Sequence, residues 1–189
     1  MGNRNRSPIV LVFAGPNGSG KTTVTRRLPV HGTYVNADDL KAEYGLTDLE
    51  AAVQAENLRN MLLESGRDFS FETVMSTDRN LLLLKRAKEA GYDVQCIYVL
   101  TCNENINVSR VISRHASGGH DVPEEKIRTR YHKALALLPE IIDVCDKILI
   151  YDNSDKPVLI FCKADSKAEI FPTNIWSESE ILKLLNRNN

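Results

Sequence analysis

Residues 15–22 read GPNGSGKT, and their types and spacing suit phosphate binding. Glycines let backbone N–H groups approach an anion, and a helix that starts near Lys21 points the positive end of its dipole at that anion. In such a loop the lysine reaches the β and γ phosphates of a nucleotide, and the hydroxyl of Thr22 holds a magnesium ion. A glycine-rich structural turn is the alternative interpretation. The stretch predicts an ATP and Mg²⁺ site formed by Asn17, Gly18, Ser19, Gly20, Lys21, Thr22 and Thr23.

Acidic residues follow two later strand-like stretches. Asp38 comes just after residues 33–36, where its carboxylate could accept the proton of a substrate hydroxyl or orient the magnesium shell. Asp39 competes for this role, and either aspartate could instead cap the following helix. Glu72, with Thr73 beside it, ends another strand and could accept hydrogen bonds from substrate hydroxyls. A solvated strand end is the alternative for Glu72.

Cationic side chains could complete a site for phosphoryl transfer, which needs a phosphate cradle, a metal, a proton acceptor and a cation. Arg110 and Arg114 share one helix face before the glycine-rich residues 117–122, which could close as a lid. Surface charge is the alternative for both arginines. His120 in this loop could bind phosphate or act as an acid, although a lone loop histidine commonly has no such role.

Other charged residues have plainer interpretations. Arg128 and Arg130 are expected on the solvated face of the next helix. Asp152 could orient a metal, but its neighbours Asn153 and Ser154 favour a turn.

These residues must be positioned by strands and helices that alternate along the chain. Strands are predicted at residues 9–14, 33–36, 68–72, 94–100, 147–152 and 158–162. Helices are predicted at residues 22–28, 47–65, 77–91 and 177–185, with further ones that start near 103 and 123. The pattern predicts an α/β fold of the P-loop kinase type, with three α/β/α layers, a central and mainly parallel sheet, and an edge hairpin. Because the carboxyl ends of parallel strands share one edge, the loop, Asp38 and Glu72 are expected to converge.

Helix 47–65 has the start signal of a capping box, Thr47 with Glu50. Its expected buried face consists of Leu49, Ala52, Val53, Met61 and Leu62.

Composition fits one globular domain over residues 1–189, with flexible residues 1–7 and a C-terminal hairpin and helix in residues 155–189. The formal charge of −1 gives no bulk reason to expect nucleic acid or a membrane as partner. The chain shows neither a signal peptide nor a run of about 20 apolar residues, so a soluble, cytoplasmic protein is expected. The four cysteines lack CxxC spacing, which favours reduced, buried thiols over a zinc site or disulfides.

Five short stretches together resemble the zeta toxin family of small P-loop kinases. They are residues 14–23 (AGPNGSGKTT), 35–38 (VNAD), 71–73 (FET), 118–123 (GGHDVP) and 151–154 (YDNS). The loop alone occurs in many families, but the ordered set is specific and extends the resemblance to about residue 154.

The resemblance implies ATP-dependent phosphorylation of a hydroxyl on a small acceptor, which in the toxin members is UDP-N-acetylglucosamine. By position, Asp38 matches the catalytic base, and Lys21 with Thr22 matches the phosphate and magnesium ligands. Glu72 matches a substrate-binding acid, and Arg114 matches a lid arginine. A possible partner is an antitoxin protein; if there is such an inhibitor, it would most simply obstruct the ATP cleft.

One position departs from the family pattern. His120 stands where the toxins place a second phosphate-binding arginine, and it carries less charge at neutral pH. The chain is therefore more similar to the broader zeta-like branch. Two alternatives are another metabolite or nucleotide kinase on the same fold, and an ATP-binding regulatory module that acts through a partner. A nucleic-acid 5′-kinase is disfavoured because no basic groove is visible.

Overall fold

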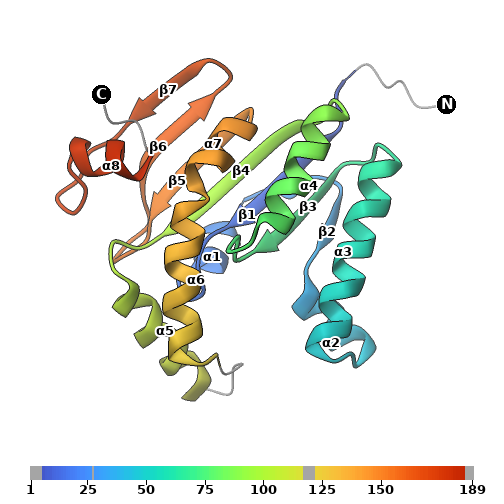
Figure 1. Ribbon diagram of the computed structural model, residues 1–189, viewed down its shortest axis with the longest axis horizontal. Helices are drawn as coiled ribbons and strands as arrows, with labels where there is room; N and C mark the ends of the chain where they lie inside the picture. The colour runs from blue at the N-terminus through green and yellow to red at the C-terminus, as the bar shows by residue number, and fades with distance from the viewer. Residues whose placement is uncertain (1–5, 27, 117–121, 186–189) are drawn as a thin grey trace.

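The computed structural model describes residues 6–26, 28–116 and 122–185. Its seven strands form one sheet in the order β2-β3-β1-β4-β5-β6-β7 (Figure 1). Their bounds are β1 Ile9–Ala14, β2 Thr33–Val35, β3 Phe69–Thr73, β4 Asp93–Leu100, β5 Lys147–Asp152, β6 Val158–Ala164 and β7 Lys167–Ile170. Strands β1 to β5 pair in parallel, whereas β6 and β7 are antiparallel. The predicted mainly parallel sheet with an edge hairpin is confirmed.

Helices connect most of the strands, and their bounds follow. They are α1 Lys21–Thr25, α2 Ala37–Tyr44, α3 Asp48–Glu64, α4 Asp78–Glu89, α5 Glu104–Ala116, α6 Glu124–Ala136, α7 Leu138–Val144 and α8 Glu178–Leu184. Helix α2 and strand β7 were not predicted. Helices α6 and α7 are separate because Pro139, in the first turn of α7, lacks the N–H that a continuous helix needs. His120 and residues 1–5 lie outside the described residues, so their predicted role and flexibility stay predictions.

Local capping signals explain where several helices begin. The Asn36 side chain accepts a hydrogen bond of 2.9 Å from the N–H of Asp38 and so caps α2. Neither Asp38 nor Asp39 is therefore needed as the cap, which leaves both carboxylates available for other contacts. The capping box of Thr47 and Glu50 is confirmed at the start of α3.

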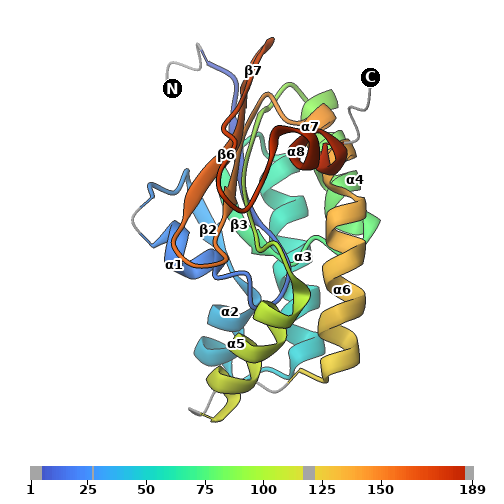
Figure 2. The same cartoon turned by 90° about the vertical axis from the view of Figure 1, so that its left-hand side faces the viewer.

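Helices cover both faces of the sheet, as Figure 2 shows in the view along its edge. Helices α3, α4, α7 and α8 pack on one face over the largest apolar cluster. On the other face, Leu11 and Phe13 of β1 pack with neighbouring β4 residues against Val24 of α1. Because successive side chains of a strand alternate in direction, β1 must be apolar throughout to be buried on both faces. The three-layer α/β/α arrangement is confirmed.

The predicted buried face of α3 is wrong at most of its positions. Leu49, Val53 and Met61 are 75%, 47% and 61% exposed. The buried face of the helix instead contains Ala51 and Ala55, each only 1% exposed, followed by Leu62 and Leu63 near its end. Because this face is buried, the helical period carries the three exposed residues outward.

The cysteine prediction holds for two of the four residues. Cys96 and Cys145 are buried free thiols, whereas Cys162 is half-buried and Cys102 is exposed. None of the described helices is long and apolar enough to span a membrane.

Candidate active site

The loop of residues 15–22 connects β1 to α1 and can be built only with glycine at key positions. Gly18 and Gly20 have φ angles of +76° and +82°, which L side chains rarely adopt. A β-carbon on Gly18 would lie 2.4 Å from the carbonyl oxygen of Asn107, and one on Gly20 would lie 2.2 Å from Asn153 Nδ2. The glycines therefore let two neighbouring elements contact the loop backbone directly.

Those two asparagines also hold the loop from outside. Asn107 Nδ2 donates to the carbonyl oxygen of Asn17 at 2.6 Å, and Asn153 Nδ2 donates to that of Ser19 at 2.8 Å. The hydroxyl of Ser19 is fully buried and has no hydrogen-bond partner among the described residues. Buried polar atoms are rarely left unpaired. The glycine cradle, whose Gly18 and Gly20 line a cavity beside Lys21 and Thr22, fits a bound phosphate chain.

Lys21 is the first residue of α1, and it is only 8% exposed. Its Nζ donates to the carbonyl oxygens of Gly15 at 2.9 Å and Pro16 at 3.3 Å, and lies 3.9 Å from Glu72 Oε1. Burial lowers the pKa of the Lys21 ammonium, and the Glu72 carboxylate opposes this shift. Burial likewise raises the pKa of Glu72, against the effect of Lys21. Strand β1 leads into the phosphate loop, and its register with β3 places Phe13 opposite Glu72. Glu72 therefore lies at the same edge of the sheet as the loop and Lys21.

Two cavities lined by described residues adjoin the loop. The smaller, the loop cavity of about 270 Å³, is lined by Gly18, Gly20, Lys21, Thr22, Thr23, Glu72, Arg110, Val111 and Arg114. The larger, the acceptor cavity of about 490 Å³, is lined by Asn17, Ala37, Asp38, Lys41, Asp48, Ala51, Arg114, Val122, Pro123, Lys126 and Arg130. Arg114 lines both, so the phosphate loop and Asp38 open into adjacent spaces. Asp39 lines neither cavity.

Other predicted site residues make contacts within the protein. The hydroxyl oxygen of Thr73 accepts hydrogen bonds from the N–H of Met75 at 3.1 Å and from Asn80 Nδ2 at 2.7 Å. Thr73 lines neither cavity, and its predicted contact with substrate stays a prediction.

Arg110 and Asp152 both contribute to the turn after β5. The guanidinium of Arg110 donates to the carbonyl oxygens of Asn153 at 2.8 Å and Ser154 at 3.0 Å. Arg110 therefore attaches α5 to this turn and is not a free surface charge. Asp152 is 3% exposed and accepts a hydrogen bond of 2.6 Å from the Ser154 hydroxyl. The turn interpretation of Asp152 agrees with this contact.

Arg130 corrects a prediction from the sequence, which placed it on a solvated helix face. Its side chain reaches back from α6 to the phosphate loop, where Nη1 donates to Asn17 Oδ1 at 3.3 Å. Together with Lys126, also on α6, it lines the acceptor cavity. Helical spacing places Lys126 and Arg130 on one face, but nothing in the local sequence shows that this face meets the loop.

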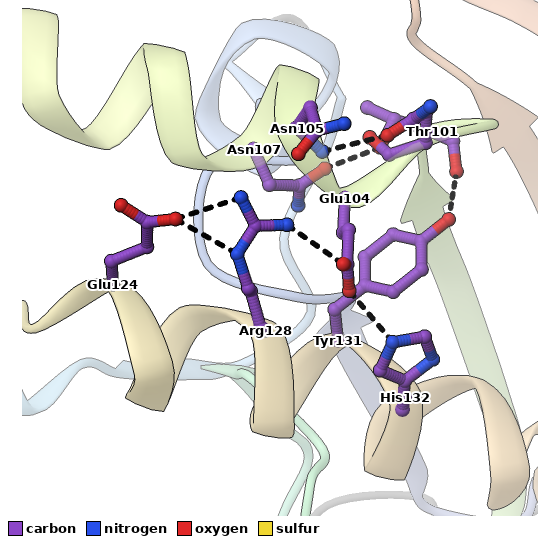
Figure 3. A network of polar contacts seen from close by, with 9 residues as sticks. Thr101, Glu104, Asn105, Asn107, Glu124, Arg128, Tyr131 and His132 are labelled. Atoms are coloured by element: carbon purple, nitrogen blue, oxygen red, sulfur yellow. Dashed lines mark hydrogen bonds and ion pairs between the residues drawn. The ribbon is translucent and has the colours of Figure 1, made fainter.

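A polar network fixes α6 in the position that this contact requires (Figure 3). Glu104, the first residue of α5, accepts from Arg128 Nη1 at 2.7 Å and faces His132 Nε2 at 2.7 Å. Tyr131 donates its hydroxyl to the carbonyl oxygen of Thr101 at 2.7 Å, just beyond β4. Helix α6 is thus attached to both α5 and the sheet. Arg128, which was expected on a solvated helix face, takes part in this attachment through Glu104.

The loop cavity also suits a magnesium ion bound to nucleotide phosphates. The described residues contain no cluster of three or more His, Cys, Asp or Glu side chains that would hold a metal alone. Magnesium at kinase sites commonly takes only one or two protein ligands and completes its shell with phosphates and water. The Thr22 hydroxyl, which lines the loop cavity, is the residue that fits this role.

A family model described as Zeta toxin matches residues 2–164. The chain belongs to the Zeta toxin family. The resemblance seen in the five sequence stretches is thereby confirmed. An uncharacterized protein of Haemophilus influenzae is 26% identical to this Zeta toxin family chain over 127 residues, which make up 64% of the chain and 91% of that protein.

Solved structures share the fold at low sequence identity. A chain of the AvrRxo1-ORF1:AvrRxo1-ORF2 complex with sulphate ions has a TM-score of 0.72 and 13% identity, covering 96% of this chain. This chain spans only 64% of that protein's length. The PezAT chromosomal toxin-antitoxin system of Streptococcus pneumoniae has a TM-score of 0.62 and 18% identity, covering 97% of this chain and 85% of the other. Family and fold together identify a kinase-type P-loop phosphotransferase.

Proposed function

We propose that this chain transfers the γ-phosphoryl group of ATP to a hydroxyl group of a small acceptor. The observation that carries the proposal is the position of Arg114, which lines both the loop cavity and the acceptor cavity. A phosphate chain near Lys21 and a hydroxyl near Asp38 would then meet beside one guanidinium. An AvrRxo1-ORF1:-ORF2 structure of the same fold is described with ATP, which supports this choice of donor.

The chain's own residues divide the work of binding the donor. Backbone N–H groups of the glycine loop and the Lys21 ammonium would hold the β and γ phosphates. The Thr22 hydroxyl would bind Mg²⁺, which supplies charge neutralisation between the phosphates when it is present. Binding a polyanion beside Lys21 would also oppose the effect of burial on its pKa, because a nearby negative charge favours the ammonium form.

The transfer step assigns one role to each remaining charged group. The Asp38 carboxylate accepts the proton of the acceptor hydroxyl, whose oxygen forms a bond to the γ phosphorus. The bond from that phosphorus to the β,γ-bridging oxygen breaks, and ADP leaves. Arg114 stabilises the negative charge on the transferred group, as a preorganised cation at this point would do. Glu72 orients Lys21 and accepts hydrogen bonds from hydroxyl groups of the acceptor.

The acceptor cavity favours an acceptor that carries negative charge. Lys41 is paired with Asp48 at 2.6 Å, which leaves Arg114, Lys126 and Arg130 facing Asp38. Guanidinium and ammonium groups are the usual protein ligands of phosphate. The volume of about 490 Å³ falls within the range of small-molecule sites. UDP-N-acetylglucosamine, with a diphosphate and free sugar hydroxyls, is therefore the first acceptor to test.

The decisive experiment incubates the protein with labelled ATP and a panel of UDP-sugars and cellular metabolites. A single phosphorylated product from UDP-N-acetylglucosamine would establish the acceptor, and a product from another compound would support a different metabolite or nucleotide kinase. Lys21→Ala should abolish the product. Transfer of phosphate only to water would contradict the proposal and favour an ATP-binding regulatory module. Absence of salt-sensitive oligonucleotide binding would remove a nucleic-acid 5′-kinase.

Two further features of the proposal follow from the family and the donor. We infer a cytoplasmic location, where ATP is available as donor. An antitoxin partner is supported by family membership and by the toxin-antitoxin system named among the similar structures. Expression of the wild type without a partner should then arrest growth, and Lys21→Ala should not. Equal growth of the two strains would contradict a toxin role without affecting the kinase assignment.

A further inference from the structure

A third cavity lies between α3 and α4, which run side by side over the sheet (Figure 1). It has a volume of about 260 Å³ and is called the Arg59 pocket here. Its lining consists of Glu56, Arg59, Asn60, Arg79, Asn80, Leu82, Leu83 and Arg86. None of these residues lines the loop cavity or the acceptor cavity. The pocket is therefore separate from the proposed kinase site.

Arg59 is the unusual residue of this pocket because its guanidinium is buried against an aromatic ring. Only 8% of the residue is exposed, and its guanidinium carbon lies 5.1 Å from the centroid of the Phe71 ring. Among the described residues it makes no hydrogen bond or ion pair, and its Nε is fully buried and unpaired. Burial lowers the pKa of Arg59, but a guanidinium does not lose its proton in proteins. A buried charge of this kind calls for a compensating anion.

The pocket carries more positive than negative charge. Arg59, Arg79 and Arg86 face a single carboxylate in the lining, that of Glu56. Glu56 already pairs with Arg79 at 3.1 Å, and Arg86 donates to Asn60 Oδ1 at 3.0 Å. Arg86 also lies 3.9 Å from Glu64 Oε1, outside the lining. Glu56 favours the charged form of Arg59 but forms its ion pair with Arg79, so among the described residues Arg59 is the guanidinium of the lining that has no ion pair. This positive charge suits an anion.

We propose that the Arg59 pocket binds a phosphate dianion, either inorganic phosphate or the phosphate group of a small monoester. Arginine forks bind two phosphate oxygens at once, and they do so best where water is excluded. The pocket has room for a phosphate group but is about half the size of the acceptor cavity, which argues against a whole nucleotide. Phosphate here bridges α3 and α4, whose polar side chains already reach across the gap.

The test must separate this pocket from the phosphate loop. Lys21→Ala weakens the loop site, so this variant is titrated with inorganic phosphate while the Arg59 Nε–H and Asn80 side-chain amide signals are followed by NMR. Both signals should shift and saturate together. Adding Arg59→Met to Lys21→Ala should lower the phosphate affinity about tenfold or more, as expected for loss of a charge-assisted contact. Glycerol 3-phosphate in a parallel titration distinguishes a monoester from free phosphate, and acetate tests the preference for a dianion.

A second pair of variants keeps the test valid if Arg59→Met fails to fold. Arg86→Gln removes a half-exposed guanidinium of the pocket and should also weaken phosphate binding in the Lys21→Ala background. Lys85→Gln is the control. Lys85 is the neighbour of Arg86 on α4 but pairs with Glu140, so its loss should leave phosphate binding unchanged. If both variants lowered the phosphate affinity equally, the effect would come from the overall positive charge of α4 and not from the pocket, and the proposal would be overturned. Unshifted Arg59 and Asn80 signals at saturating phosphate would overturn it as well.

Discussion

Arg130 Nη1 lies 3.3 Å from Asn17 Oδ1, although 113 positions separate the two residues in the chain. The contact brings helix α6 directly onto the phosphate loop and places a guanidinium in the cavity that also contains Asp38. Because a planar guanidinium presents several donors, it can hold Asn17 and still donate to a phosphate oxygen. Arg130 thus supplies a further guanidinium to the acceptor cavity, in addition to that of Arg114.

Arg130→Gln should lower kcat/KM for phosphoryl transfer by roughly tenfold or more, because it removes a charge-assisted contact near the phosphates. Steady-state kinetics with varied ATP measure this effect. Lys85→Gln is the control, since Lys85 pairs with Glu140 at 2.8 Å and lines neither cavity. It should leave kcat/KM unchanged, because a surface ion pair contributes little to stability. Similar kinetic losses in both variants would refute a specific role for Arg130.

Asp38→Asn should reduce phosphoryl transfer by roughly 10²- to 10⁴-fold while ATP binding remains, because the amide cannot accept the hydroxyl proton. Single-turnover transfer and ATP titration measure the two properties separately. Asp39→Asn is the control, because it removes the charge of the neighbouring carboxylate, which lines neither cavity. This variant should retain most of the activity. A larger loss with Asp39→Asn than with Asp38→Asn would exchange the two assignments.

Gly18→Ala should abolish ATP binding, because its β-carbon would lie 2.4 Å from the backbone oxygen of Asn107 in α5. Gly45→Ala provides the comparison, since Gly45 has a similar φ of +65° but no atom within 4 Å of a β-carbon. This control should cost about 1–2 kcal/mol of stability from backbone strain alone and leave ATP affinity intact. Denaturant unfolding and ATP titration of both proteins measure the difference. Normal ATP affinity in Gly18→Ala would show that the loop can relax away from α5.

Glu72→Gln should change the pH dependence of stability. Burial raises the pKa of Glu72 above its usual value of 4.5, so the folded protein binds that proton more tightly than the unfolded chain does. The stability from this group is present below the unfolded pKa and is lost as pH rises through the folded pKa. The free energy of unfolding of wild type should therefore fall relative to Glu72→Gln as the pH rises above about 4.5. Denaturant titrations over this range should reveal the change, and a constant difference would contradict the shift.

The amino-acid sequence by itself determined the phosphate loop, the order of most strands and helices, and the capping box at Thr47 and Glu50. These features are local, because glycine spacing, apolar runs and caps act through neighbouring residues. The five stretches that indicate the family are also short contiguous runs of residues, so they can be recognised without the structure. The position of Asp38 near the loop followed as well, since parallel strands end at one edge.

Only the tertiary structure decided which side chains meet. It attached Arg110 to the turn after β5, directed Arg130 toward Asn17 and buried Arg59 against the ring of Phe71. Helical spacing relates a side chain to its own axis, but it contains no information on what packs against that axis. The same reason explains the error in α3, where Ala51 and Ala55 are buried while Leu49, Val53 and Met61 are exposed. Contacts between distant segments depend on how whole elements pack, and this packing is a property of the complete fold.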